Sequence, residues 1–177
     1  MSSLFTPKNS EAPGDSPQKK VSESRKSSKE KSLSGTAKQD GIELRLTLTK
    51  PKYDLDEEIS IKLVLTNRGE AAKTLIFPDT QRFDIWVEEA RAISDHPLIV
   101  WRWSFEMSFA QIIGEEVLEP GQKLTYKASW DQRWQTLPVG KYERPSSFPG
   151  RYTLFGVIGK ESQVLVGPAK VSIVISE

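Results

Sequence analysis

Several short segments of this chain alternate apolar and polar residues, the period of two that is typical of half-buried β-strands. The most aromatic example is the stretch RFDIWVEE, whose inward positions would be Phe83, Ile85 and Val87. A second segment, LIVWRWSF, follows it, with Ile99, Trp101, Trp103 and Phe105 on one side. The Ser, Asp and Pro residues between the two segments favour a turn. We therefore predict a hairpin whose apolar faces, two tryptophans included, lie in the core.

The same alternation recurs along most of the remaining chain after Gly41. It is seen in residues 42–49, 58–67, 73–77, 122–130, 150–159 and 168–177. Turn signals separate these segments, among them Asn67-Arg68-Gly69 and Pro120-Gly121. No segment has a convincing amphipathic helical pattern. Seven to nine short strands with turns between them predict an all-β fold, an immunoglobulin-like antiparallel β-sandwich with Greek-key connections.

The first forty residues differ from the rest, because Ser and Lys dominate and aliphatic residues are few. Such a composition buries too little apolar surface to offset the entropy lost on ordering. We predict a disordered N-terminal tail over residues 1–40, followed by one sandwich domain over residues 41–177. The tail has eight basic and five acidic residues, a charge of about +3. It is either a plain solvated tail or an electrostatic tether and phosphorylation target.

Bulk composition narrows the functional classes. The 177 residues have a formal net charge of +1, so no nucleic acid or anionic membrane is required as a partner. Cysteine is absent, which excludes disulfides and thiol catalysis and suits a reducing compartment. No apolar run approaches the ~20 residues that span a bilayer, and no signal peptide is recognisable. We predict a monomeric, soluble, cytoplasmic protein that binds neither nucleic acid nor membrane.

Catalytic motifs are missing from the sequence. The only histidine, His96, precedes a proline in a predicted turn, and no spacing supplies it with a nucleophile and an acid. No phosphate-binding glycine loop and no zinc motif is present. Asp54, Asp56, Glu57 and Glu58 cluster at a strand start, but their spacing matches no calcium loop and favours a solvated acidic turn. We predict that the protein is not an enzyme and has no metal or cofactor.

Five short motifs follow one another in a fixed order along the second part of the chain. They are RFDI from Arg82, VWRWS from Val100 with Phe109 beyond it, LEPG from Leu118, WDQ from Trp130 and PGRY from Pro149. This ordered set resembles the BsuPI family of intracellular proteinase inhibitors. The resemblance covers residues 41–177. It implies an immunoglobulin-like sandwich that inhibits a cytoplasmic subtilisin-type serine protease. The tail and the long segment 131–149 depart from the compact form of the family.

Two functions follow from these observations. The first is stoichiometric inhibition of a protease, in which a rigid loop occludes the active-site cleft as an extra strand. The second is a non-inhibitory immunoglobulin-like protein-binding module tethered by its tail. An inhibitor would be expected to block a subtilisin-type protease, whereas a binding module would be cleaved or ignored.

The predicted protease contact lies in the long connection Asp131–Pro149. It is rich in aromatic residues, arginine and proline, which anchor interfaces and limit the entropy lost on docking. Leu137 and Tyr142 are the first side chains to test, and Trp134 is a third candidate. Alternatively, Trp134 and Phe148 only fold the loop onto the sandwich. The rival contact is Ser104–Gly114, with Met107 and Phe109 as its apolar side chains.

Overall fold

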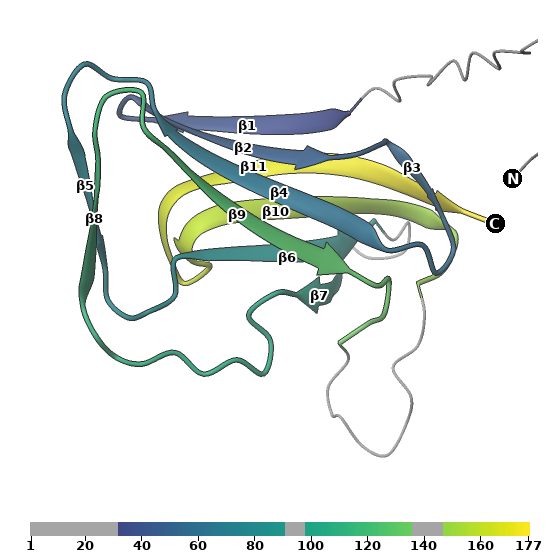
Figure 1. Ribbon diagram of the computed structural model, residues 1–177. Helices are drawn as coiled ribbons and strands as arrows, with labels where there is room; N and C mark the ends of the chain where they lie inside the picture. The colour runs from purple at the N-terminus through teal and green to yellow at the C-terminus, as the bar shows by residue number, and fades with distance from the viewer. Residues whose placement is uncertain (1–31, 91–97, 136–146) are drawn as a thin grey trace, which may run out of the picture.

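The structure, a computed structural model, describes residues 32–90, 98–135 and 147–177 (Figure 1). These residues form eleven strands and no helix, and therefore no helix that could cross a membrane. The strands are β1 (Leu33–Gln39), β2 (Ile42–Leu48), β3 (Lys52–Asp54), β4 (Ile59–Asn67), β5 (Lys73–Phe77), β6 (Phe83–Glu89), β7 (Leu98–Arg102), β8 (Gly114–Leu118), β9 (Lys123–Trp130), β10 (Gly150–Lys160) and β11 (Gln163–Ser176). The predicted all-β class is confirmed.

Two sheets pack face to face as a sandwich, in which the inward side chains of both form one core. One sheet has the strand order β1-β2-β4-β9, and the other has the order β3-β11-β10-β6-β7 (Figure 1). Pairing is antiparallel except between β3 and β11, which run parallel. The alternation in residues 42–48 and 59–65 places Leu and Ile inward as predicted, and these side chains are almost fully buried.

A separate pair, β5 with β8, stands at one end of the sandwich, on the left of Figure 1. The chain passes through β5 from the first sheet to the second, and it returns through β8 to β9. The pair therefore belongs to the crossovers that link the two sheets.

A tyrosine corner fixes the start of β10. The hydroxyl of Tyr152 donates a hydrogen bond to the carbonyl oxygen of Phe148 at 2.8 Å and accepts one from the Phe148 N–H at 3.1 Å. A tyrosine hydroxyl that bonds to the backbone a few residues upstream is a hallmark of immunoglobulin-like sandwiches. The motif PGRY, from which the resemblance was partly inferred, thus has a structural role at this corner.

The predicted inward side of β7 is only partly correct. Ile99 is 40% exposed, whereas Val100 and Trp101 are both buried. The cause is a β-bulge: Glu88 pairs with Ile99 and Val87 pairs with Trp101, so Val100 is an extra residue on β7. The strand also ends at Arg102 instead of continuing to Phe105, although Trp103 still packs against the core.

The domain begins earlier than predicted, because β1 lies inside the segment 1–40 that we expected to be a tail. Its inward residues are Leu33, Gly35 and Ala37, too small and too few to produce a strong apolar pattern. Small residues are needed here, since a Cβ atom on Gly35 would lie 1.8 Å from the carbonyl oxygen of Lys170. Residues 1–31 of the predicted tail lie outside the described residues.

Truncation should separate the two parts of the predicted tail. Deleting residues 1–31 should leave the melting temperature unchanged, because this segment has few apolar residues. Deleting residues 1–40 removes β1, exposes the edge of β2 and should lower the melting temperature by several degrees. Differential scanning calorimetry of both variants measures the difference, and equal melting temperatures would contradict a stabilising role for β1.

The two tryptophans at the end of β7 should differ in their contribution to stability. Trp101 is buried, so Trp101→Ala should lower the free energy of unfolding by about 3–5 kcal/mol. Trp103 is partly exposed, and Trp103→Ala should lower it by less. Urea unfolding monitored by circular dichroism gives both values. A larger loss for Trp103→Ala would show that its contacts dominate this end of the core.

Candidate functional site

The connection between β7 and β8, residues 103–113, has no strand of its own and lies on the surface. We call it the β7–β8 connection. It includes most of the rival contact segment Ser104–Gly114 named above. Loops of this length without regular structure are frequently functional, so its anchoring and exposure decide what it can do.

The start of the β7–β8 connection is fixed to β6. The backbone N–H of Trp103 donates to the carbonyl oxygen of Ile85 at 2.8 Å, and its ring stacks on Phe83 with 4.0 Å between ring centroids. The next residue, Ser104, donates its hydroxyl proton to a carboxylate oxygen of Asp84 at 2.8 Å. The backbone and ring of Trp103 and the side chain of Ser104 therefore all bind to β6 at this end of the connection.

A second set of contacts fixes the middle of the same connection. Thr80 and Ala110 are joined twice, because the Thr80 N–H donates to the Ala110 carbonyl and the Ala110 N–H donates to the Thr80 hydroxyl, each at 3.0 Å. The ring of Phe109 lies 6.1 Å from that of Trp103. The connection is thus tied down on both sides of Met107, and then leads directly into β8.

Apolar side chains are concentrated on the exposed side of this anchored connection. Met107, Ile112 and Ile113 are 47%, 63% and 73% exposed. Ile76 on β5 and Val117 on β8 are also exposed and lie in the adjacent strand pair. Of the nine large hydrophobic residues that are exposed in the described part of the chain, five therefore lie in this connection or in the strand pair that it enters. Exposed apolar side chains that are concentrated along one stretch of chain make that stretch a candidate protein-binding surface.

Asp84 is an unusual residue at the base of the connection, because it is 1% exposed and carries a carboxylate. Burial raises the pKa of this carboxyl above its ordinary value, while the hydrogen bonds from Ser104 and the Ile85 N–H, and the nearby Arg102, act in the opposite direction. A buried polar side chain that meets two donors orients both of them. Asp84 thereby positions the first turn of the β7–β8 connection.

The other predicted contact, Asp131–Pro149, is described only at its two ends. These ends are joined, since Ser147 donates from both its N–H and its hydroxyl to the carbonyl oxygen of Gln132, each at 2.7 Å. The buried Gln132 amide in turn donates to the carbonyl oxygens of Asp54 and Glu57. The loop therefore has a fixed base. Leu137 and Tyr142 lie outside the described residues.

Trp134, the third side chain proposed in this loop, is buried with 6% exposure and belongs to the core cluster. Its ring meets that of Phe148 edge to face at 5.7 Å. This geometry agrees with the alternative in which the two rings fold the loop base onto the sandwich. Of the five candidate residues, Met107 and Phe109 are brought together in the β7–β8 connection, and Met107 is the more exposed of the two.

The acidic turn at Asp54–Glu58 is organised by local bonds. Glu57 pairs with Lys50 at 2.8 Å and accepts a hydrogen bond from the Asp54 N–H. Among the described residues, no three His, Cys, Asp or Glu side chains are grouped as metal ligands would be. His96 lies outside the described residues.

Sequence reasoning missed Asp84 as a positioning residue and Ile112 and Ile113 as exposed residues. Asp84 carried a weak signal, since it is an acid on the outward side of a strand rich in aromatic residues. The two isoleucines carried none, because an adjacent apolar pair in a segment without periodicity is compatible with burial as well as exposure. Only the fold shows that both lie outside the sandwich.

The geometry described above defines an immunoglobulin-like sandwich that presents an anchored, apolar surface connection. The model of the BsuPI family, described as intracellular proteinase inhibitor, matches residues 46–161. The chain therefore belongs to the BsuPI family. The matched range includes the β7–β8 connection and the loop 131–149, whereas β1 lies before it. A comparison with curated proteins returns no match.

Solved structures with a similar chain path are distant. A β-glucosidase from Listeria innocua is 13% identical with a TM-score of 0.43, and the match covers 77% of this chain and 16% of that one. Alkylpurine DNA glycosylase AlkC from Pseudomonas fluorescens, bound to DNA, is 14% identical with a TM-score of 0.42, and the match covers 77% of this chain and 31% of that one. The sporulation control protein Spo0M from Bacillus subtilis is 12% identical with a TM-score of 0.43, and the match covers 78% of this chain and 51% of that one. This chain thus spans at most about half of these proteins, and the likeness carries no argument about function.

The raised pKa of Asp84 predicts a pH-dependent contribution to stability. The folded state binds the Asp84 proton more tightly than the unfolded state does. The contribution of Asp84 to the free energy of unfolding is therefore greatest at low pH. It falls as the pH rises from the ordinary pKa of a carboxyl group through the raised pKa of the folded state. Asp84→Asn should remove this fall. Subtracting the variant's free energy of unfolding from that of the parent, at each pH, should give a curve that decreases with pH.

Glu115→Gln, which removes an exposed carboxyl on β8, is the matched control for this measurement. A flat difference curve for Asp84→Asn would mean that Asp84 keeps one protonation state across the range. Asp84→Ala should behave differently again, because it leaves the buried Ile85 N–H and the Ser104 hydroxyl without their acceptor and should cost about 1–3 kcal/mol.

Proposed function

We propose that this protein is a stoichiometric inhibitor of an intracellular subtilisin-type serine protease, and that the β7–β8 connection contacts the active-site cleft. Membership of the BsuPI family supports inhibition of a proteinase. The observation that carries the contact site is the exposed apolar group Met107, Ile112 and Ile113 on a segment anchored by Trp103, Ser104 and Ala110. We further propose that the protein acts as a monomer in the cytoplasm.

Occlusion by this segment has a simple physical basis. An extended segment can add a strand to the edge of a protease cleft through backbone hydrogen bonds, with side chains filling the specificity pockets. Large apolar side chains suit subtilisin-type clefts, and this connection offers three of them. Because the Asp84–Ser104 and Thr80–Ala110 contacts hold the segment before binding, little conformational entropy is lost on docking.

The loop Asp131–Pro149 is the second candidate for the contact. Its described ends are joined by the hydrogen bonds from Ser147 to Gln132, and Leu137 ahead of Pro138 stays the predicted apolar side chain. The buried position of Trp134 leaves fewer exposed aromatic residues than the sequence suggested. We therefore rank the β7–β8 connection first.

A titration against a subtilisin-type protease with a chromogenic peptide substrate tests this proposal. The parent protein should inhibit with a fixed stoichiometry. Ile112→Asp/Ile113→Asp and Met107→Asp place charge on the exposed apolar side chains, and at least one of these variants should raise the inhibition constant about thirtyfold or more, as the loss of a hot spot does. Circular dichroism confirms that each variant is folded.

Two further variants make the result specific. Leu98→Asp changes an exposed apolar residue at the start of β7, the opposite end of that strand from the proposed contact, and should inhibit like the parent. Leu137→Ala/Tyr142→Ala should also inhibit like the parent. Loss of inhibition in that double variant alone would move the contact to the loop 131–149. Absence of inhibition by the parent against several subtilisin-type proteases would favour the binding module.

A further inference from the structure

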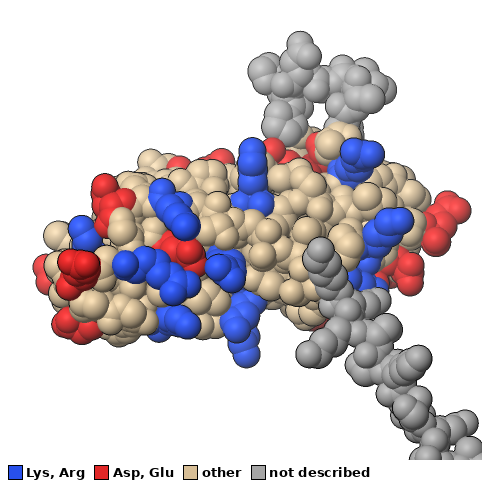
Figure 2. All heavy atoms as spheres, turned by 90° about the horizontal axis from the view of Figure 1, so that it is seen from above, with Lys and Arg blue, Asp and Glu red and all other residues tan. Residues whose placement is uncertain are grey.

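The outward face of the four-stranded sheet has a strongly uneven charge. Its strands β1, β2, β4 and β9 contain one acidic residue, Glu43. They contain five basic residues, which are Lys38, Arg45, Lys62, Lys123 and Lys127. Arg68, directly after β4, adds a sixth cation, and Figure 2 shows basic side chains crowded over part of the surface around an acidic group. We call these six cations the basic face.

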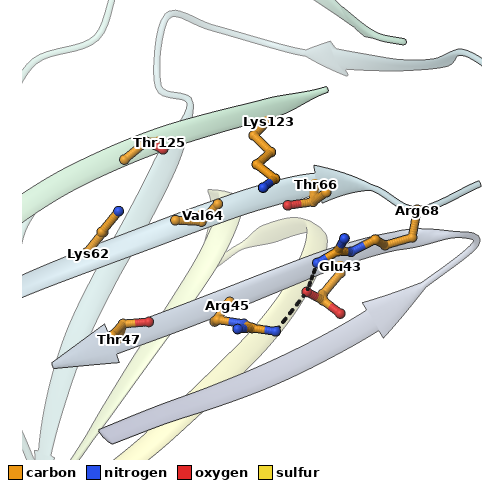
Figure 3. Close-up of a pocket in the computed structure, with 9 residues that line it drawn as sticks. All are labelled: Glu43, Arg45, Thr47, Lys62, Val64, Thr66, Arg68, Lys123 and Thr125. Atoms are coloured by element: carbon orange, nitrogen blue, oxygen red, sulfur yellow. Dashed lines mark hydrogen bonds and ion pairs between the residues drawn. The ribbon is translucent and has the colours of Figure 1, made fainter. Parts of the chain in front are cut away.

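Glu43 shows how the basic face holds a carboxylate. One of its carboxylate oxygens accepts hydrogen bonds from Arg68 at 3.0 Å and Arg45 at 3.2 Å (Figure 3). Lys38 lies 3.8 Å from the other oxygen. The Glu43 side chain is 10% exposed, whereas the two arginines remain about half exposed. The hydrogen bond from Arg68 contributes most to a Glu43 pKa below its ordinary value. The carboxylate is therefore ionised and enclosed by cations at neutral pH.

The lysines of β4 and β9 have no such counter-charge. Lys62 and Lys127 are directly opposite each other in the pairing of the two strands, and both are exposed. Like charges in opposite positions of an antiparallel pair are destabilising. Neither Lys62, Lys123 nor Lys127 forms an ion pair with any described residue. The sheet thus carries an unfavourable arrangement that an anionic partner would relieve.

The surface between these cations is hollowed. One hollow, of about 340 Å³, has Arg45, Lys62 and Lys123 along it, as Figure 3 shows, with hydroxyl groups of Thr47, Thr66 and Thr125 between them. A second hollow, of about 400 Å³, continues past Lys62 to Lys127. The two hollows share Thr47 and Lys62, so cations and hydroxyl groups, with apolar side chains in the second hollow, lie along neighbouring depressions on three strands.

We propose that this basic face is a docking site for an acidic segment of a partner protein, separate from the protease contact. Charge complementarity selects an anion, and the bonds to Glu43 show that the face suits carboxylates. Nucleic acid fits less well, since no aromatic side chain lies on the outward positions to stack with bases and the net charge of the chain is only +1.

The chain's own first 31 residues do not supply this occupant. They contain seven basic residues and four acidic ones, so their net charge has the same sign as the face. The proposed occupant is therefore an acidic segment of a partner protein.

A deca-glutamate peptide, labelled for fluorescence anisotropy and mixed with the full chain, tests the proposal. It should bind, and binding should weaken as ionic strength rises. Lys62→Gln/Lys127→Gln should weaken binding about five- to tenfold. The matched control Lys52→Gln/Lys170→Gln removes the same charge from exposed positions of the other sheet and should bind like the parent.

Lys127→Glu gives a second, opposite readout. It places an opposite charge across the strand pair from Lys62, so the melting temperature should rise by about 1–3 °C while peptide binding is lost. Equal losses of binding in the two Gln double variants would mean diffuse attraction only and would overturn the proposal. Tighter binding of a DNA duplex of matched charge than of the peptide would overturn it too, in favour of nucleic acid.

Discussion

The packing of Trp130 against Trp101 and Tyr152 is the contact on which both sheets depend. Trp130, at the end of β9, is fully buried, with its ring centroid 6.4 Å from that of Trp101 on β7 and 5.6 Å from that of Tyr152 on β10. It therefore joins the four-stranded sheet to the five-stranded one. Because β7 is an edge strand, this contact also fixes the point from which the β7–β8 connection leaves the sandwich.

Anchoring and exposure are combined in that connection. Trp103 and Phe109 face the molecule and pack on each other, whereas Met107, Ile112 and Ile113 face solvent. Exposed apolar side chains add no hydrophobic stabilisation to the folded state, since their surface stays in water. Their position on a segment with several hydrogen bonds to β6 and Thr80 is consequently better explained by binding than by stability.

The fold was largely predictable from sequence, and the reasons for the exceptions are physical. Strong alternation in 42–48 and 59–65 identifies strands because Leu and Ile fill every inward position. The strand β1 was missed since close approach of β11 requires Gly35, which carries no apolar signal. The bulge at Val100 was missed because strict alternation assumes that each residue of a strand pairs with one residue of the neighbouring strand. Met107 was predicted as a candidate, but the exposure of Ile112 could only come from the fold.

Charge in this protein illustrates why a net value says little about a surface. The formal charge of +1 gave no reason to expect an anionic partner. Lys62 and Lys127 are 65 positions apart along the chain, and only the antiparallel register of β4 with β9 places them opposite each other. The acids that balance them lie elsewhere, as at Glu115 and Glu116 of β8. The exposed apolar side chains of the β7–β8 connection and the cations of the basic face lie on different parts of the sandwich, so a partner on the basic face need not compete with a protease at the proposed contact.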